Sequence, residues 1–213
     1  INKVGGALST AIVGITLITD PEHLTLLAKL AKSDDAVIKE EATRALRSSA
    51  GPMTDRPPFD QTAAWLARLD ALPGKADAET GRRLFFNPKT ALCANCHRHS
   101  GRGTVLGPDL SLIAKQGDRA AILRSILEPQ REVAPQFYPS HVKLKDGTEF
   151  VGIMLRSSSS EAFRDLTGKE VSYLKEQILE RTEMKTSLMP PALVATMTDA
   201  ELRDLLAFLM SAP

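Results

Sequence analysis

The chain has 213 residues, of which 43% are apolar and 25% are charged, and its formal net charge is +1. This length and apolar content can bury at least one good core and allow two or three small domains. A charge balance so close to neutral gives no sign of a nucleic-acid partner. The chain begins at Ile1 and shows no secretory signal, so we expect a piece cut from a longer protein.

The first third of the chain has the pattern of paired helices. The longest apolar run, residues 4–18, is shorter than the ~20 residues that a membrane-spanning helix needs, so we expect a buried helix and no membrane span. Asp20-Pro21 favours a helix start, and a second helix is expected after residues 33–35. Together they resemble one HEAT-type repeat unit. We therefore assign residues 1–50 to a HEAT-like fragment with a scaffold role.

A linker and a single helix are expected next. Gly51-Pro52 and Arg56-Pro57-Pro58 break the helical pattern, and residues 59–72 have apolar positions at helical spacing. Trp65 lies in this helix, where packing is the commoner role for a tryptophan than lining the edge of a cofactor. We assign residues 51–76 to this linker and helix.

Two helices near the ends of the remaining chain are expected to cross closely. The first, residues 77–86, carries Gly81 and Phe85 four positions apart. The last helix begins at a capping box formed by Thr198 and Glu201. A glycine lets another backbone approach, and a phenylalanine one turn later can fill the space beside it.

The central motif is Cys93-Ala94-Asn95-Cys96-His97, which is typical of c-type haem attachment. Two thiols at this spacing can reach the two vinyl groups of one porphyrin edge. The histidine that follows then supplies an imidazole nitrogen as the proximal ligand of the iron. These are the only two cysteines in the chain. The motif therefore predicts one covalent haem c.

Two other interpretations of the cysteines stay open. A thioredoxin-like dithiol also has two cysteines three apart, but it expects a strand before them and a helix after them, whereas both flanks here are typical of loops. A zinc site could use Cys93 and Cys96 with one or both of His97 and His99. Structural zinc, however, usually takes a second pair of ligands beyond a longer loop.

Residues 77–213 resemble a class I cytochrome c, through the haem motif and the two crossing helices. In that family a G-P-x-L loop follows the motif, here Gly107-Pro108-Asp109-Leu110. The resemblance implies that the Pro108 carbonyl accepts the other N–H of His97 and that Leu110 lies at the cofactor. It also implies that Met189, in a Met-Pro loop before the last helix, is the axial ligand.

The axial position has alternatives. Met184 is the runner-up to Met189 because it lies five residues upstream in the same region. His141, or an open site with no protein ligand, is the other possibility. A histidine two residues beyond the proximal one, such as His99, cannot swing across the haem.

A segment at about 138–181 is longer than a small cytochrome c has at this place. Its alternating apolar residues and its Asp146-Gly147 turn predict a small antiparallel β-sheet, which could shield a haem edge or offer a docking face. The order of these motifs resembles the haem-binding domain of planctomycete and verrucomicrobial type, often fused behind helical repeats and a dehydrogenase-like β-propeller. The expected fold class is mainly α: a cytochrome c-like helical haem domain with an inserted small antiparallel β-sheet, preceded by HEAT-like helix pairs.

The resemblance implies single-electron transfer and no enzymatic activity of this domain itself. The expected iron ligands are His97 and Met189, and the expected redox partner is a fused or associated dehydrogenase. Covalent haem attachment occurs on the outer side of the energy-transducing membrane, which implies the periplasm. The alternatives are a peroxidase-like haem enzyme with an open distal site and a zinc-binding module without redox function.

Overall fold

The computed structural model describes residues 21–35, 38–39, 42–43, 46, 55–87, 90–191 and 193–211. The chain divides into two compact units, Ile1–Asp55 and Arg56–Pro213. In the first unit, α2 (Pro21–Leu30) is the first of the two expected paired helices. The buried helix expected over 4–18, much of the second paired helix and Gly51-Pro52 lie outside the described residues. The HEAT-like assignment therefore stays a prediction.

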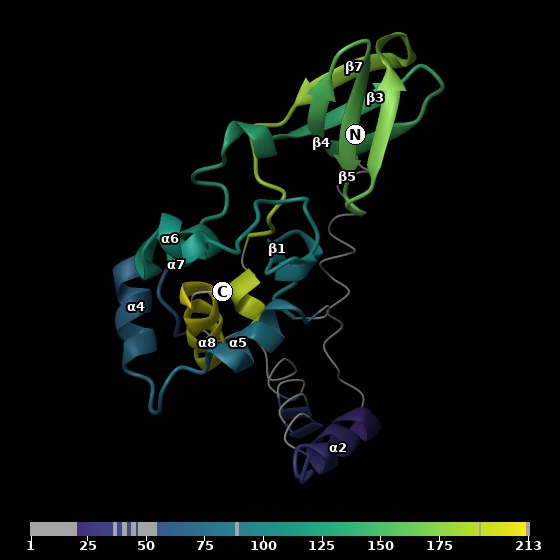
Figure 1. Cartoon of the computed structure of the whole chain (residues 1–213). Helices are drawn as coiled ribbons and strands as arrows, with labels where there is room; N and C mark the ends of the chain where they lie inside the picture. The colour runs from purple at the N-terminus through teal and green to yellow at the C-terminus, as the bar shows by residue number, and fades with distance from the viewer. Residues whose placement is uncertain are drawn as a thin grey trace. The chain divides into compact units, whose positions relative to one another are not determined.

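The second unit contains both helices and strands (Figure 1). Its helices are α4 (Thr62–Asp70), α5 (Ala78–Phe85), α6 (Ile113–Gln116), α7 (Arg119–Leu127) and α8 (Asp199–Met210), with short 3₁₀ turns η1 (Cys93–Asn95), η2 (Pro135–Phe137), η3 (Lys175–Gln177) and η4 (Leu193–Thr196). Its strands are β1 (Arg98–His99), β2 (Arg102–Gly103), β3 (Pro139–Leu144), β4 (Glu149–Ser157), β5 (Ser160–Asp165), β6 (Glu170–Leu174) and β7 (Ile178–Glu183).

Side-chain caps start the two helices that cross. The Asp77 carboxylate accepts the backbone N–H groups of Glu79 and Thr80 at 2.9 and 3.3 Å, and so begins α5. At α8 the predicted capping box is present: Glu201 N donates to Thr198 Oγ1 at 3.2 Å, and Thr198 N donates to Glu201 Oε2 at 2.7 Å. Both starts follow from local sequence alone.

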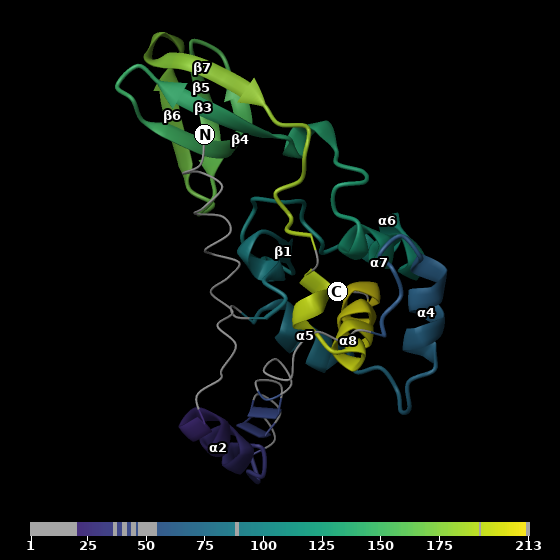
Figure 2. The same ribbon diagram turned by 180° about the vertical axis from the view of Figure 1, so that it is seen from behind.

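Helices α5 and α8 lie side by side in both views (Figures 1 and 2). Gly81 is the contact point, because a Cβ built there would lie 2.0 Å from Asp204 O and 2.9 Å from Leu205 N. Only glycine permits this approach. Phe85 is completely buried beside it and its ring centroid lies 5.5 Å from that of Phe208. The predicted close crossing is confirmed.

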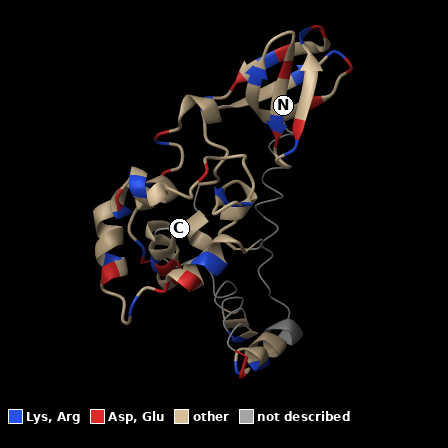
Figure 3. Ribbon diagram, viewed as in Figure 1, with Lys and Arg blue, Asp and Glu red and all other residues tan. Residues whose placement is uncertain are grey.

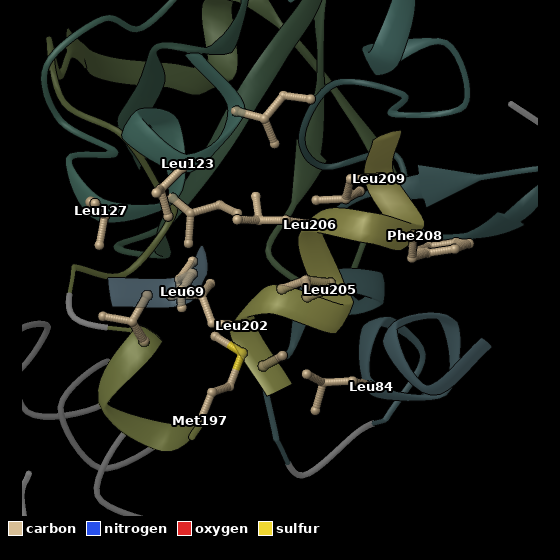
Figure 4. Close-up of a cluster of buried hydrophobic side chains, with 14 of the residues drawn as sticks. Leu69, Leu84, Leu123, Leu127, Met197, Leu202, Leu205, Leu206, Phe208 and Leu209 are labelled. Carbon is tan, nitrogen blue, oxygen red and sulfur yellow. The ribbon is translucent and has the colours of Figure 1, made fainter. Parts of the chain in front are cut away.

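One apolar core joins the helices of this unit (Figure 4). Leu205 and Leu206 of α8 contribute to it together with Leu123 of α7, and Trp65 of α4 is completely buried in it. The Trp65 indole N–H donates to Pro58 O at 3.1 Å, so the tryptophan is a packing anchor with its polar atom satisfied. Helix α4 thus shares its core with α5, α7 and α8.

The stretch expected to be a linker is tied to the same helices. The Arg56 guanidinium donates to Val194 O at 2.7 Å and to Met197 O at 2.5 Å, and it pairs with the Asp199 carboxylate at 2.9 Å. Arg68 holds the other oxygen of Asp199 at 2.6 Å. A negative charge at the first residue of α8 also suits the helix dipole. Two cations therefore fix the start of α8 to the residues on both sides of Pro57-Pro58.

Strands β3–β7 form a five-stranded antiparallel sheet in the order β6-β5-β4-β3-β7. The Asp146-Gly147 turn joins β3 to β4, and Gly147 takes the left-handed φ of +91° that the turn requires. The sheet has a core of its own, formed by Val142, Leu144 and Phe163. Figure 3 shows both signs of charge interspersed over its strands.

The prediction of a mainly α, cytochrome c-like fold is wrong. A five-stranded antiparallel sheet stands beside the helices of Arg56–Pro213, so this unit is of mixed α and β class. The physical reason is that residues 139–183 bury an apolar cluster of their own, separate from the helical core. The segment therefore forms a sheet with its own core and is not a small addition to a helical domain.

No membrane span was expected. Among the described residues, no helix combines the length and the apolar character needed to cross a lipid bilayer.

Candidate cofactor-attachment site

The two cysteines lie at the two ends of one tight turn. Residues Cys93–Asn95 form η1, and His97 N donates to Cys93 O at 2.8 Å. Just before the turn, Ala91 and Leu92 have φ values of +21° and +59°. Such values are rare for residues other than glycine and cost about 1–3 kcal/mol each, and strain of this kind clusters at functional sites.

The His97 ring is fixed on one nitrogen. Its Nδ1 lies 2.9 Å from Pro108 O, the hydrogen bond expected for a proline carbonyl that supports a ligating imidazole. Gly107 packs against the same ring, since a Cβ built there would lie 2.6 Å from His97 Cε1 and 2.9 Å from Nδ1. Any side chain at 107 would displace the imidazole. With Nδ1 engaged by a carbonyl, Nε2 is the nitrogen left to bind a metal.

Backbone hydrogen bonds hold the Pro108 loop against the motif. Thr104 N donates to Ala94 O at 3.0 Å, and Gly107 N donates to Cys96 O at 2.7 Å. Further along, Leu110 N donates to Arg98 O at 2.8 Å. The position of the Pro108 carbonyl is therefore set by three bonds between main-chain groups, which do not depend on side-chain rotamers.

The flank after the motif, expected to be a loop, is a two-stranded hairpin. Its strands β1 and β2 pair Arg98 with Gly103 and His99 with Arg102, around a left-handed Ser100-Gly101 turn. This hairpin turns the His99 side chain into the core, where it is only 2% exposed.

His99 is surrounded by aromatic rings and not by the motif cysteines' thiols. Its ring centroid lies 4.4 Å from that of Phe208 and 5.8 Å from that of Phe85. Its Nδ1 lies 3.1 Å from Ser100 Oγ. Among the described residues, no three His, Cys, Asp or Glu side chains gather as a cation site.

The environment of the thiols does not suit dithiol exchange. Burial raises the pKa of Cys93 to about 12, and burial also raises the pKa of Cys96. A reactive dithiol needs the opposite, a lowered pKa that yields thiolate at neutral pH. The sulfur of Cys93 lies 3.6 Å from Ala91 O, and its side chain packs against the helical core. An apolar environment of this kind is compatible with thioethers, which carry no charge.

The ionisation of His97 suits metal binding. Loss of hydration lowers the pKa of His97, against the smaller opposing effect of the hydrogen bond to Pro108 O. The imidazole is therefore neutral at neutral pH, which is the form that ligates metals. These residues fit a c-type haem. The two thiols are uncharged and three residues apart, the His97 imidazole is neutral with one nitrogen occupied, and Gly107 leaves room for the imidazole ring.

The structure brings Met189 and Leu110 to the same core as Cys93. All three are partly buried and pack against the helical cluster. Met184 lies elsewhere: its backbone N–H donates to Pro139 O at 2.7 Å and so continues the pairing of β7 with β3. His141 is also in the sheet, with its Nε2 3.2 Å from Glu149 Oε2.

Sequence reasoning missed two residues near the site and the role of a third. Gly107 was identified only as the first residue of the G-P-x-L loop, and its contact with the His97 ring was not predicted. Gln130 bonds to the Met189 loop, and Arg164 of β5 donates to Val105 O at 3.0 Å in the loop that supports His97. For the last two no local signal exists, because their partners lie 59 residues away in the chain.

The chain matches no known protein-family model, and no curated protein matches it. The site must therefore be judged on its own geometry.

Proposed function

We propose that Arg56–Pro213 carries one covalent c-type haem and transfers single electrons. Cys93 and Cys96 would provide the thioether links, and His97 and Met189 the two axial ligands. The observation that carries the proposal is the fixed His97 ring, with Nδ1 on Pro108 O at 2.9 Å and Gly107 against its face, directly after the two cysteines. A dithiol does not need that arrangement, and structural zinc usually takes a second pair of ligands beyond a longer loop.

The residues of the chain have definable tasks. Pro108 O holds the proton on Nδ1 of His97, which selects the tautomer and increases the basicity of the free nitrogen. Leu110 and Met189 pack against the helical core and are partly buried, which lowers the local dielectric and would favour the less charged state of the site. When bound, the haem supplies a reversible one-electron couple, and thioether ligation raises its reduction potential relative to two histidines.

The partner and the compartment belong to the same proposal. A fused or associated dehydrogenase would donate the electrons, as the resemblance in domain order implies, and the domain itself would not be an enzyme. Because covalent attachment of haem takes place outside the energy-transducing membrane, we assign the protein to the periplasm.

The first experiment tests the attachment. The chain is expressed together with a c-type haem maturation system, and its intact mass and alkaline pyridine spectrum are measured. We expect the mass of one haem and a haemochrome spectrum, both lost in the Cys93→Ser/Cys96→Ser double variant and kept in His141→Ala. Colourless wild-type protein, or protein that holds zinc in place of iron, would show that the proposal is wrong.

The second experiment tests the axial ligand by matched methionine variants. Ferric wild-type protein should show the weak red band of a thioether ligand and should resist cyanide. Met189→Ala should lose the band and bind cyanide readily, while Met184→Ala, five residues upstream, should behave as wild type. A high-spin wild-type spectrum with ready cyanide binding would indicate a haem enzyme with an open site instead.

A further inference from the structure

We propose that Gln130 is the positioning residue of the Met189 loop, holding the methionine backbone in place so that its thioether stays at the cofactor. This inference rests on the proposed function, because only there does Met189 have a ligand to make. Gln130 follows Pro129 at the end of α7, far in sequence from the loop that it contacts. It belongs to neither the haem motif nor the helical core.

The Gln130 carboxamide makes four hydrogen bonds to the loop. Its Oε1 accepts from Thr186 Oγ1 at 2.5 Å and from Ser187 N at 2.7 Å. Its Nε2 donates to Ser187 O at 3.2 Å and to Met189 O at 3.3 Å. A carboxamide has two acceptor positions and two N–H donors, and this one uses all four on a single loop.

The hydrogen-bond pattern selects glutamine at this position. The main-chain N–H of Ser187 can face only an acceptor, and the two carbonyls can face only donors, so the amide cannot be flipped. A glutamate would keep the acceptors but lose both donors, and would place negative charge against the carbonyls of Ser187 and Met189. An alanine would remove all four bonds.

The loop is held on both sides of Met189. The backbone N–H of Met189 donates to Ser187 Oγ at 3.0 Å, and the backbone carbonyl of Met189 accepts from Gln130 Nε2. Pro190 and Pro191 follow, and their rings limit the backbone further. The fold therefore orders the Met189 backbone before any ligand bond forms, so less entropy is lost when the side chain binds.

A loosened loop has a measurable consequence. An added ligand such as imidazole can bind the ferric site only when the methionine is away from it, so its apparent affinity rises in proportion to the fraction of open loop. We expect imidazole to bind Gln130→Ala at least about tenfold more tightly than wild type, a change of 1.4 kcal/mol in the loop equilibrium. Gln130→Glu should show a similar or larger rise.

The experiment is an imidazole titration of the ferric, haem-loaded full chain, combined with amide hydrogen exchange at Ser187 and Met189. The matched control is Gln177→Ala, which removes another glutamine-to-backbone bond, from Leu174 N to Gln177 Oε1 at 2.8 Å, in the sheet. Gln130→Ala should raise both imidazole affinity and exchange. The control should leave both unchanged. A rise in imidazole affinity confined to Gln130→Ala, with faster exchange confined to Ser187 and Met189, separates positioning from general destabilisation.

Failure of this inference is distinct from failure of the proposed function. Wild-type protein without haem, or without the red thioether band, would overturn the proposed function. Wild-type protein with the band, but with Gln130→Ala equal to it in imidazole affinity, would overturn the role of Gln130 alone. Should Gln130→Ala fail to fold, Thr186→Val removes one of the four bonds at nearly constant volume, and a rise of about threefold is expected; no rise would count against the inference.

Discussion

Gly81→Ala tests whether the crossing of α5 and α8 depends on a missing side chain. The new Cβ would lie 2.0 Å from Asp204 O, whereas ordinary contact begins at 3.4 Å. The atom it meets belongs to the backbone of α8, which cannot rotate away. The two helices would therefore have to separate by more than about 1 Å, and a gap of that size forfeits roughly a quarter to a half of the dispersion energy across it.

Two effects of opposite sign set the size of the change. Forcing extra volume into a packed contact costs about 3 kcal/mol or more when backbone must move, while alanine is better than glycine inside a helix by about 1 kcal/mol. We therefore expect Gly81→Ala to lower the free energy of unfolding by about 2 kcal/mol. For a unit of this length that corresponds to a fall in melting temperature of roughly 4–8 °C.

The assay is thermal and urea unfolding followed by far-UV circular dichroism. Gly117→Ala is the matched control, because its Cβ would only reach ordinary contact, 3.4 Å from Ala121 Cβ, at an extended φ of −155°. The free energy of unfolding of Gly117→Ala should stay within about 0.5 kcal/mol of that of wild type. If Gly81→Ala proved as stable as wild type or more stable, helix propensity would outweigh the clash and the close crossing would be refuted.

Three further changes probe other parts of the unit. Gly107→Ala places a Cβ 2.6 Å from the His97 ring, so the haem-loaded protein should lose its low-spin visible spectrum; an unchanged spectrum would contradict the contact. Gly168→Ala strains a residue at φ +84° and approaches a threonine methyl at 2.4 Å, so urea titration should show a loss of about 1–3 kcal/mol, and no loss would disprove the strain. Hydrogen bonds from the Thr80 side chain and backbone hold the pKa of Asp77 below its usual value. The contribution of the Asp77 carboxylate to the free energy of unfolding is therefore complete above its pKa in the unfolded chain, near 3.9, and is lost as the pH falls through its pKa in the folded protein. Wild type should lose more stability than Asp77→Asn between about pH 5 and about pH 3, and equal slopes would show that Asp77 contributes nothing.

Local chemistry explains which features the sequence could predict. The caps of α5 and α8 depend on residues two or three positions apart. The capping box of Thr198 and Glu201 was predicted on that basis, while Asp77 was predicted only as the first residue of its helix. The hydrogen bond from His97 to Pro108 O spans 11 residues and was available only through a family resemblance. The Asp146-Gly147 turn was visible because a left-handed glycine has a strong local signal.

Long-range pairing explains what the sequence could not predict. Arg56 reaches Val194 and Met197, and Gln130 reaches Met189, across separations of 138, 141 and 59 residues. The hydrophobic periodicity of a sequence does not indicate pairs so far apart in the chain. The antiparallel sheet at about 138–181 was expected, but the mainly α assignment underestimated it. The cluster of Val142, Leu144 and Phe163 gives the sheet a core of its own, which the strand patterns alone do not indicate.

The sheet topology explains how Gln130 and Met189 can meet. Strand β3 enters the sheet and β7 leaves it, and these two strands are neighbours, with Ser140 opposite Glu183. The chain therefore returns to its starting place, and the segments before β3 and after β7 begin side by side. If the segment between Gln130 and Met189 were flexible, forming their contact would cost loop-closure entropy. The paired strands hold the two ends of this segment together once the protein has folded. The pairing of β3 with β7 therefore brings together the two segments that carry Gln130 and Met189, whatever the length of the hairpins between the strands.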